Sequence, residues 1–248
     1  YKEMKYIFSL HNHSTFSNDK FMRRETPEKI LNQIVKDKIY VISITDARED
    51  IFFDYIINKR SDYAHICTVE KISNSIILLD YGNWESYLIR GMEKHDCEGH
   101  MLIIGTDSKI KYNDSYTIKD WIVYTNDNGG ICGPAHPIEQ FVGGMGVDAL
   151  LKHIHKFDFI EIFNAQLVFN KNANIAAELL SDKFNVPGIA TSDSHNHKNL
   201  IKSYFYTETK ENISVQSLRD IIRDKRFTNF KRYITYRELF MTYIIRRL

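Results

Sequence analysis

Histidine and acidic residues recur in this chain directly after short apolar runs, and they are the residues best suited to chemistry. The first two are His11 and His13, which follow the apolar run of residues 7–10. Side chains at positions i and i+2 of a strand point to the same face, so both imidazoles would leave this strand toward one point. An isolated His-x-His pair is more often a pair of surface histidines, so the interpretation depends on the later strand ends.

Other candidate ligands also lie at the ends of apolar runs. They are Asp46, Glu93, His100, His136, Asn164, Asp193 and His195. Imidazoles and carboxylates without cysteine at these positions suit manganese, zinc or iron. Glu93 lies between histidine sites and is a candidate bridge between two cations, whose mutual repulsion a shared carboxylate would offset. The pattern predicts a metal site with more than one ion.

The apolar runs alternate with amphipathic segments, which indicates repeated strand–helix units. We expect strands at residues 4–10, 39–45, 100–105, 131–135, 157–163 and 186–191, and helices at 26–37, 50–59, 117–128, 147–156, 170–184 and 214–225. Residues 61–90 are less regular, with 64–69 and 75–80 as candidates for paired strands and 87–92 for another. The rhythm predicts an α/β fold with a parallel, barrel-like or doubly wound sheet, in which functional residues gather at the C-terminal strand ends.

Composition excludes several classes of protein. The 248 residues are 43% apolar, which predicts one domain over residues 1–248. A net charge of +1 creates no overall field that would favour nucleic acid or a membrane. No apolar run approaches the length of a membrane span, so we expect no membrane partner. The three cysteines are far apart, which predicts reduced thiols in a cytoplasmic protein.

The C-terminal segment has a different balance of charge. We expect a core over about residues 5–210, followed by a helical segment at 211–248. Residues 219–248 contain nine Lys or Arg and three Asp or Glu. This basic excess suits nucleic acid or an anionic substrate, but the interleaved Phe240, Tyr243, Ile244 and Ile245 equally suit a helix that docks on the core or on a second subunit. Both interpretations stay open.

Taken in order, the motifs resemble those of the PHP family (polymerase and histidinol phosphatase domains). The resemblance covers about residues 5–210 and rests on His11-x-His13, Thr45-Asp46, Gly91-Met92-Glu93, Glu98-Gly99-His100, Ala135-His136-Pro137, Glu161-x-Phe163-Asn164 and Ser192-Asp193-Ser194-His195. It implies a distorted (β/α)7 barrel with a metal site at the C-terminal ends of the strands. It also implies a metal-dependent phosphoesterase with two or three divalent ions.

The resemblance assigns a role to each matching position. It implies a first metal bound by His11, His13, Glu93 and Asp193, a second bound by Glu93, His100 and His136, and a third bound in part by His195. The sequence departs from the family at Ala47, where a histidine is usual, and at Asn18 or Asp19, where an acidic or histidine ligand is usual. Alanine cannot bind a metal. We therefore expect two ions of Mn, Zn or Fe, or a weakly occupied third position that uses Asp19 and His195.

The expected reaction is hydrolysis by a water that two metals activate. Two divalent ions about 3.5–4 Å apart can bind a phosphate ester and stabilise its attacking and leaving oxygens. His195 is the candidate general acid if no third metal binds it. Arg48 is a candidate phosphate ligand because its guanidinium fork suits phosphate oxygens, although a surface pairing with Glu49 or Asp50 is the alternative. His95 is expected on the surface.

The sequence therefore predicts a phosphoesterase acting on a phosphorylated small molecule or nucleotide, with short nucleic acid as a further candidate partner. The resemblance points to the family's free-standing nucleotidases and 5′-to-3′ exonucleases. Two alternatives remain: a histidinol-phosphate phosphatase, and a non-catalytic binding module, which Ala47 and Asn18 make conceivable.

Overall fold

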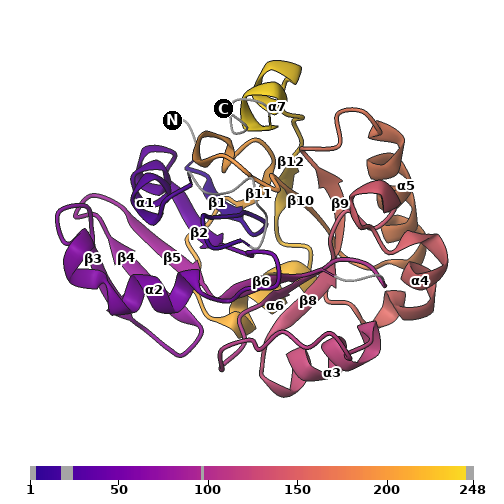
Figure 1. The fold of residues 1–248 in the computed structure, drawn as a ribbon, viewed down its shortest axis with the longest axis horizontal. Helices are drawn as coiled ribbons and strands as arrows, with labels where there is room; N and C mark the ends of the chain where they lie inside the picture. Colours follow the sequence, from indigo (N-terminus) through magenta and orange to yellow (C-terminus); the bar gives the residue numbers. More distant parts are fainter. Residues whose placement is uncertain (1–3, 18–24, 96–97, 244–248) are drawn as a thin grey trace.

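Strands and helices alternate along most of the chain in the computed structural model, which describes residues 4–17, 25–95 and 98–243 (Figure 1). The strands are β1 (Tyr6–Ser9), β2 (Ile39–Ser43), β3 (Thr68–Lys71), β4 (Ile76–Asp80), β5 (Glu85–Ile89), β6 (Gly91–Lys94), β7 (Met101–Ile104), β8 (Ile131–Pro134), β9 (Ile160–Asn164), β10 (Gly188–Thr191), β11 (Tyr204–Thr207) and β12 (Thr228–Phe230). The helices are α1 (Pro27–Lys36), α2 (Phe52–Asn58), α3 (Ile118–Asp127), α4 (Gly146–His153), α5 (Lys171–Phe184), α6 (Val215–Arg223) and α7 (Tyr236–Tyr243).

The described strands pair into three sheets and do not close a barrel. Seven strands form one sheet in the order β12-β11-β1-β2-β5-β4-β3, while β10 pairs with β9, and β6, β7 and β8 form a third sheet. Only the β1–β2, β2–β5 and β9–β10 pairs are parallel. The runs β3–β4–β5 and β6–β7–β8 are antiparallel. The fold is therefore a mixed α/β fold, and the pairing of the described strands does not confirm the expected (β/α)7 barrel.

Isolated bridges connect the three sheets at one end. Asn12, after β1, bridges Ser194, after β10, and Ala47, after β2, bridges Glu93 in β6. Glu93 is itself a candidate ligand, and the other three residues each lie next to a candidate site residue. The end of the fold where the sheets meet is thus the end that carries the candidate functional residues.

Local sequence explains where the helices begin and what they bury. Pro27 occupies the first turn of α1, where its missing N–H costs no hydrogen bond. Ile30, Leu31 and Ile34 lie on one face of that helix and are fully buried. Helix α3 begins with a reciprocal capping box between Thr117 and Asp120. These features confirm the helices expected near residues 26–37 and 117–128.

Two parts of the chain differ from the sequence prediction. Residues 61–90 do form paired strands, but β3 starts at Thr68, four residues later than expected. The C-terminal segment contains a strand as well as a helix, because β12 pairs with β11 and extends the central sheet before α7 begins.

Cys67 and Cys132 are buried free thiols, in agreement with the expected reduced state. Within the described ranges, no helix has the length and apolar character needed to cross a bilayer.

Candidate metal centre

The predicted ligands come from every sheet of the fold and meet where the three sheets join. His11 and His13 follow β1, Glu93 lies within β6, and Asp193 follows β10. His100 precedes β7 and does not end it. Because β7 runs antiparallel to β8, Met101 pairs with Pro134, and the start of β7 lies beside the end of β8, where His136 follows.

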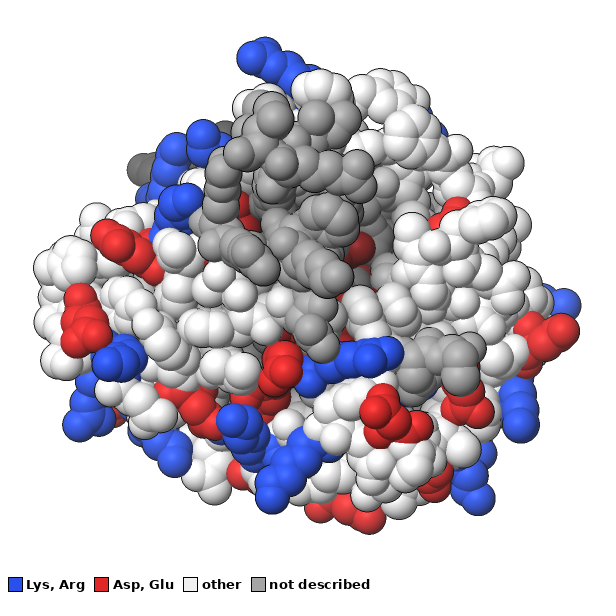
Figure 2. Space-filling model, viewed as in Figure 1, with Lys and Arg blue, Asp and Glu red and all other residues white. Residues whose placement is uncertain are grey.

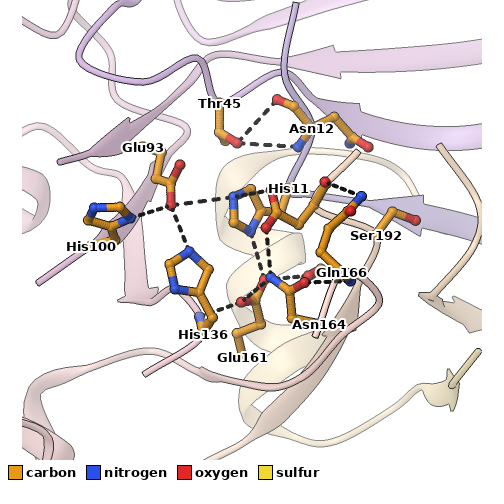
Figure 3. A network of polar contacts seen from close by, with 12 residues as sticks. His11, Asn12, Thr45, Glu93, His100, His136, Glu161, Asn164, Gln166 and Ser192 are labelled. Atoms are coloured by element: carbon orange, nitrogen blue, oxygen red, sulfur yellow. Dashed lines mark hydrogen bonds and ion pairs between the residues drawn. The ribbon is translucent and has the colours of Figure 1, made fainter. Parts of the chain in front are cut away.

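The carboxylate of Glu93 is the centre of the site, and five imidazoles surround it. Figure 3 shows three of them, His11, His100 and His136, directed at this carboxylate. Its Oε1 lies 3.5 Å from His11 Nε2, 3.3 Å from His100 Nδ1 and 3.2 Å from His136 Nε2. Its Oε2 lies 3.4 Å from His13 Nε2 and 2.5 Å from His95 Nε2. Glu93 is 2% exposed, so this carboxylate depends on its neighbours to balance its charge.

Asp193 is the second carboxylate of the site. Its Oδ1 lies 3.1 Å from His13 Nε2, 3.4 Å from His11 Nε2 and 3.5 Å from His195 Nδ1. Asp193 and Glu93 therefore approach His11 and His13 from two sides. Each carboxylate also contacts histidines that the other does not touch.

Glu161 holds one ligand from behind. His11 Nδ1 donates to Glu161 Oε1 at 2.7 Å, which leaves His11 Nε2 directed at Glu93 and Asp193. Asn164 Nδ2 donates to Glu161 Oε2 at 3.1 Å and to Asp193 Oδ2 at 3.0 Å. A carboxylate that binds the distal nitrogen of a ligating histidine fixes its tautomer and raises its basicity. Sequence reasoning placed Glu161 in a motif but gave it no role.

Asp46 holds the loop that carries His13. Its carboxylate accepts hydrogen bonds from the Ser14 N–H and hydroxyl, both at 2.5 Å. Burial raises the pKa of Asp46 to about 7, against the effect of the two Ser14 hydrogen bonds. Asp46 belongs to none of the groups of described residues whose side chains converge as ligands. This candidate from the sequence therefore positions the site.

The pKa shifts of four histidines at the centre of the site differ in direction. Burial lowers the pKa of His11, but the carboxylates of Asp193, Glu161 and Glu93 outweigh it and hold that pKa well above its usual value. Burial also lowers the pKa of His136, but the Glu93 carboxylate outweighs this effect, and the pKa of His136 is raised. Burial and the charge of His195 lower the pKa of His13 to about 4, and burial also lowers the pKa of His100.

The two carboxylates of the site, Glu93 and Asp193, both have lowered pKa values. Burial would raise the pKa of Glu93 and of Asp193, but neighbouring histidines outweigh it and hold both pKa values well below their usual range. Both groups are therefore anionic at neutral pH. A buried anionic pair surrounded by imidazoles is a cation-binding environment.

The backbone at the site adopts conformations that are rare outside glycine. His136 has φ 31° and Asp193 has φ 47°, both in the left-handed range. Such residues concentrate at functional sites, where the surrounding structure holds them in place. Gly143 is required for a related reason, because a Cβ there would lie 2.1 Å from His100 Nε2.

The donor set fits divalent metal ions. His11 Nε2 is buried and makes no hydrogen bond, although two carboxylate oxygens lie 3.4 and 3.5 Å away. Two ligands bound tetrahedrally at zinc distances lie about 3.4 Å apart, so this spacing leaves room for an ion. Three groups of converging side chains occur among the described residues: His11, His13 and Glu93; His13, Asp193 and His195; and Glu93, His100 and His136.

His95 was expected on the surface, away from the site, but the structure places it against Glu93. Its side chain is 30% exposed, its Nε2 contacts Glu93, and its ring stacks on His100 with centroids 3.7 Å apart. The His95 carbonyl accepts hydrogen bonds from Arg48 Nε at 2.8 Å and from Tyr112 Oη at 2.6 Å. A sequence signal existed, because residues two apart on a strand share a face, and Glu93 and His95 are two apart.

Of the remaining candidates, the structure describes Arg48 but not Asp19. Arg48 is exposed, packs over the Tyr112 ring at 5.2 Å and supports the His95 backbone. The alternative pairing with Asp50 is not formed, because the Asp50 carboxylate binds Arg90 at 2.8 Å. The predicted ligand Asp19, like Asn18, lies outside the described residues.

Comparison with known proteins gives structural likeness only. The sequence matches no protein-family model and no curated protein. PsfC from Pseudomonas syringae has 14% identity and a TM-score of 0.63, with 98% of each chain covered. The lesion-specific endonuclease PfuEndoQ from Pyrococcus furiosus has 16% identity and a TM-score of 0.64, over 89% of this chain and 56% of the endonuclease.

A third solved structure comes from Bifidobacterium adolescentis and is assigned as a metal-dependent phosphoesterase. It has 13% identity and a TM-score of 0.51, over 77% of this chain and 88% of its own. At these identities the likeness establishes a shared fold. The donor set, taken by itself, fits divalent metal ions.

Proposed function

We propose that this chain is a metal-dependent phosphoesterase that hydrolyses a phosphomonoester or a nucleotide end, like a nucleotidase or a 5′-to-3′ exonuclease. The observation that carries the proposal is the convergence of five imidazoles on Glu93, beside Asp193. The order of the motifs supports membership of the PHP family and a distorted (β/α)7 arrangement with open strand pairing. The endonuclease and phosphoesterase neighbours support hydrolysis of phosphate esters.

The residues divide into two overlapping ligand sets. His11, His13, Glu93 and Asp193 would hold one divalent ion, and Glu93, His100 and His136 would hold a second, with Mn, Zn or Fe as suitable metals. Such ions would bind the phosphate oxygens and activate the attacking water. His95 is an additional imidazole on Glu93. It could compensate for Ala47, whose side chain offers no ligand atom.

Removing the metal is the direct test of this function. Metal-reconstituted protein is expected to hydrolyse phosphomonoesters, nucleotides or 5′-phosphorylated oligonucleotides, and chelation is expected to abolish that hydrolysis because the site then lacks its cationic charge. Adding back Mn, Zn or Fe should restore activity. Tight metal binding without hydrolysis of any ester would refute the proposal and favour a binding module.

His195 and Arg48 have separable proposed roles. His195 Nδ1 donates to the Asp193 carbonyl at 2.9 Å, which orients its ring beside the ligands, and as general acid it would protonate the leaving oxygen. His195→Ala should lower kcat about 100-fold at unchanged metal content. Arg48→Met should raise KM if Arg48 binds phosphate. Kinetics and metal analysis of both variants, with exposed His155→Ala as control, provide the measurement.

Different results would exclude the proposed role of His195 and that of Arg48. Loss of metal from His195→Ala would make His195 a ligand, and full activity at normal metal content would exclude it as the acid. Unchanged KM and kcat in Arg48→Met would rule out phosphate binding by Arg48.

A further inference from the structure

A cavity of about 700 Å³ lies over the candidate metal centre. Its base is formed by the ligand side chains of His13, Glu93, His100, His136 and Asp193 together with His95 and His195. Apart from Gln166, its walls are apolar and come from three separate parts of the chain: Val142, Leu167, Phe169, Tyr236, Leu239 and Phe240. This volume is in the range of cavities that bind small molecules.

The walls carry three aromatic rings that are exposed by more than half. Phe169 is 78% exposed, Tyr236 64% and Phe240 54%. The Phe169 and Tyr236 rings lie 5.4 Å apart at 45°, so the segment after β9 and helix α7 form one aromatic rim. Large exposed apolar groups gathered around a polar base mark a ligand site.

The charges of the described residues around the cavity do not favour a long polyanion. None of the described residues that line it is Lys or Arg. Four of the nine basic residues of the C-terminal segment pair with an acidic side chain of this chain: Arg219, Arg223, Arg226 and Lys231. Where Figure 2 shows described side chains, blue and red ones are interspersed and form no continuous basic track. Binding of a nucleic-acid strand relies on such a track.

We propose that the cavity binds a small phosphomonoester whose alcohol carries a flat apolar or aromatic group. The phosphate would lie on the ligand side chains, and the apolar group would lie against Phe169, Tyr236 and Phe240. In the reaction a water oxygen forms a bond to phosphorus, the bond from phosphorus to the alcohol oxygen breaks, and that oxygen takes up a proton. This inference rests on the proposed function and names its substrate class.

The test compares two esters of similar leaving group. Benzyl phosphate and ethyl phosphate are both esters of primary alcohols, so their difference reports on the apolar group. With metal-loaded protein, kcat/KM for benzyl phosphate should exceed that for ethyl phosphate by at least about 30-fold. Phe240→Ala and Phe169→Ala should each lower this ratio about tenfold. Leu179→Ala, which removes an apolar side chain that is 63% exposed on α5, is the matched control and should keep the ratio.

Binding provides a readout that does not depend on turnover. Benzylphosphonate should bind the metal-loaded protein more tightly than ethylphosphonate, and Phe240→Ala should remove most of that difference in Kd. Equal hydrolysis and equal binding of the two series would overturn the inference while leaving the proposed function intact. Selective binding of benzylphosphonate without hydrolysis of any ester would refute the proposed function and keep only the ligand class that the inference assigns to the cavity. Strong preference for a 5′-phosphorylated oligonucleotide, with a steeply salt-dependent KM, would overturn it in favour of nucleic acid.

Discussion

Glu93→Gln is expected to remove at least one metal ion and to lower kcat/KM by about 1,000-fold or more. The substitution keeps the size of the side chain but removes a charge that lies within 3.5 Å of five imidazoles. Without that anion, two divalent ions would have no shared carboxylate to offset their repulsion. Metal content by elemental analysis and phosphomonoester kinetics measure the two effects.

A folding control is needed because Glu93 is buried. Removing one partner from a buried ionic network costs on the order of 3–5 kcal/mol, so circular dichroism must show that the variant is folded. Glu93→Asp retains the charge and should keep part of the metal. Glu70→Gln makes the same exchange at an exposed position of β3 and should change nothing. Wild-type metal content and activity in Glu93→Gln would contradict the assignment of Glu93 as the bridge.

The convergence of the ligands was predictable, whereas the architecture that produces it was only partly so. His11, His13 and His136 follow short apolar runs, and the rule that strand ends carry function selects them directly. The direction of pairing is not encoded in such runs. A four-residue apolar strand such as β7 reads the same whether its neighbours are parallel or antiparallel. The antiparallel β6–β7–β8 sheet was therefore missed, although His100 still reaches the same edge.

His95 and Glu161 show why individual roles are harder to predict than motifs. The parity of His95 depends on where β6 ends, and Arg48 and Tyr112, from distant parts of the chain, hold its carbonyl. Glu161 gains its role only because β9 lies where its carboxylate reaches His11 Nδ1. Both roles arise from long-range contacts that local periodicity does not contain.

The C-terminal segment is a similar case. Its apolar residues predicted a docked helix, and α7 does bring Leu239 and Phe240 to the cavity. Its basic residues suggested nucleic acid, but several of them pair within the chain. Charge counts over a sequence window do not reveal which partners the fold provides.

Metal binding is expected to release protons and to strengthen steeply with pH. Metal ligation requires neutral imidazoles. The carboxylates around His11 and His136 hold the pKa of each above its usual value, so these are the two histidines from which metal binding is expected to displace protons near neutral pH. His13, with a pKa of about 4, and His100, with a lowered pKa, are already neutral there. About one to two protons should leave per chain, which corresponds to a ten- to hundredfold gain in apparent affinity per pH unit.

Calorimetric titration with metal, in two buffers of different ionisation enthalpy, counts these protons. His136→Asn should lower the count by about one, whereas exposed His155→Asn should leave it unchanged.

The thermal stability of the metal-free protein, measured against pH, independently checks the direction of the histidine pKa shifts. A raised pKa in the folded state stabilises the fold below the unfolded value near 6.5 and loses that contribution as pH rises through the folded value. The His11 contribution to metal-free stability should therefore decline above pH 6.5, while metal-loaded protein gains stability. Metal affinity that stays flat between pH 6 and 8, with no proton released, would show that His11 and His136 are neutral before metal arrives and that the surrounding carboxylates do not set their charge.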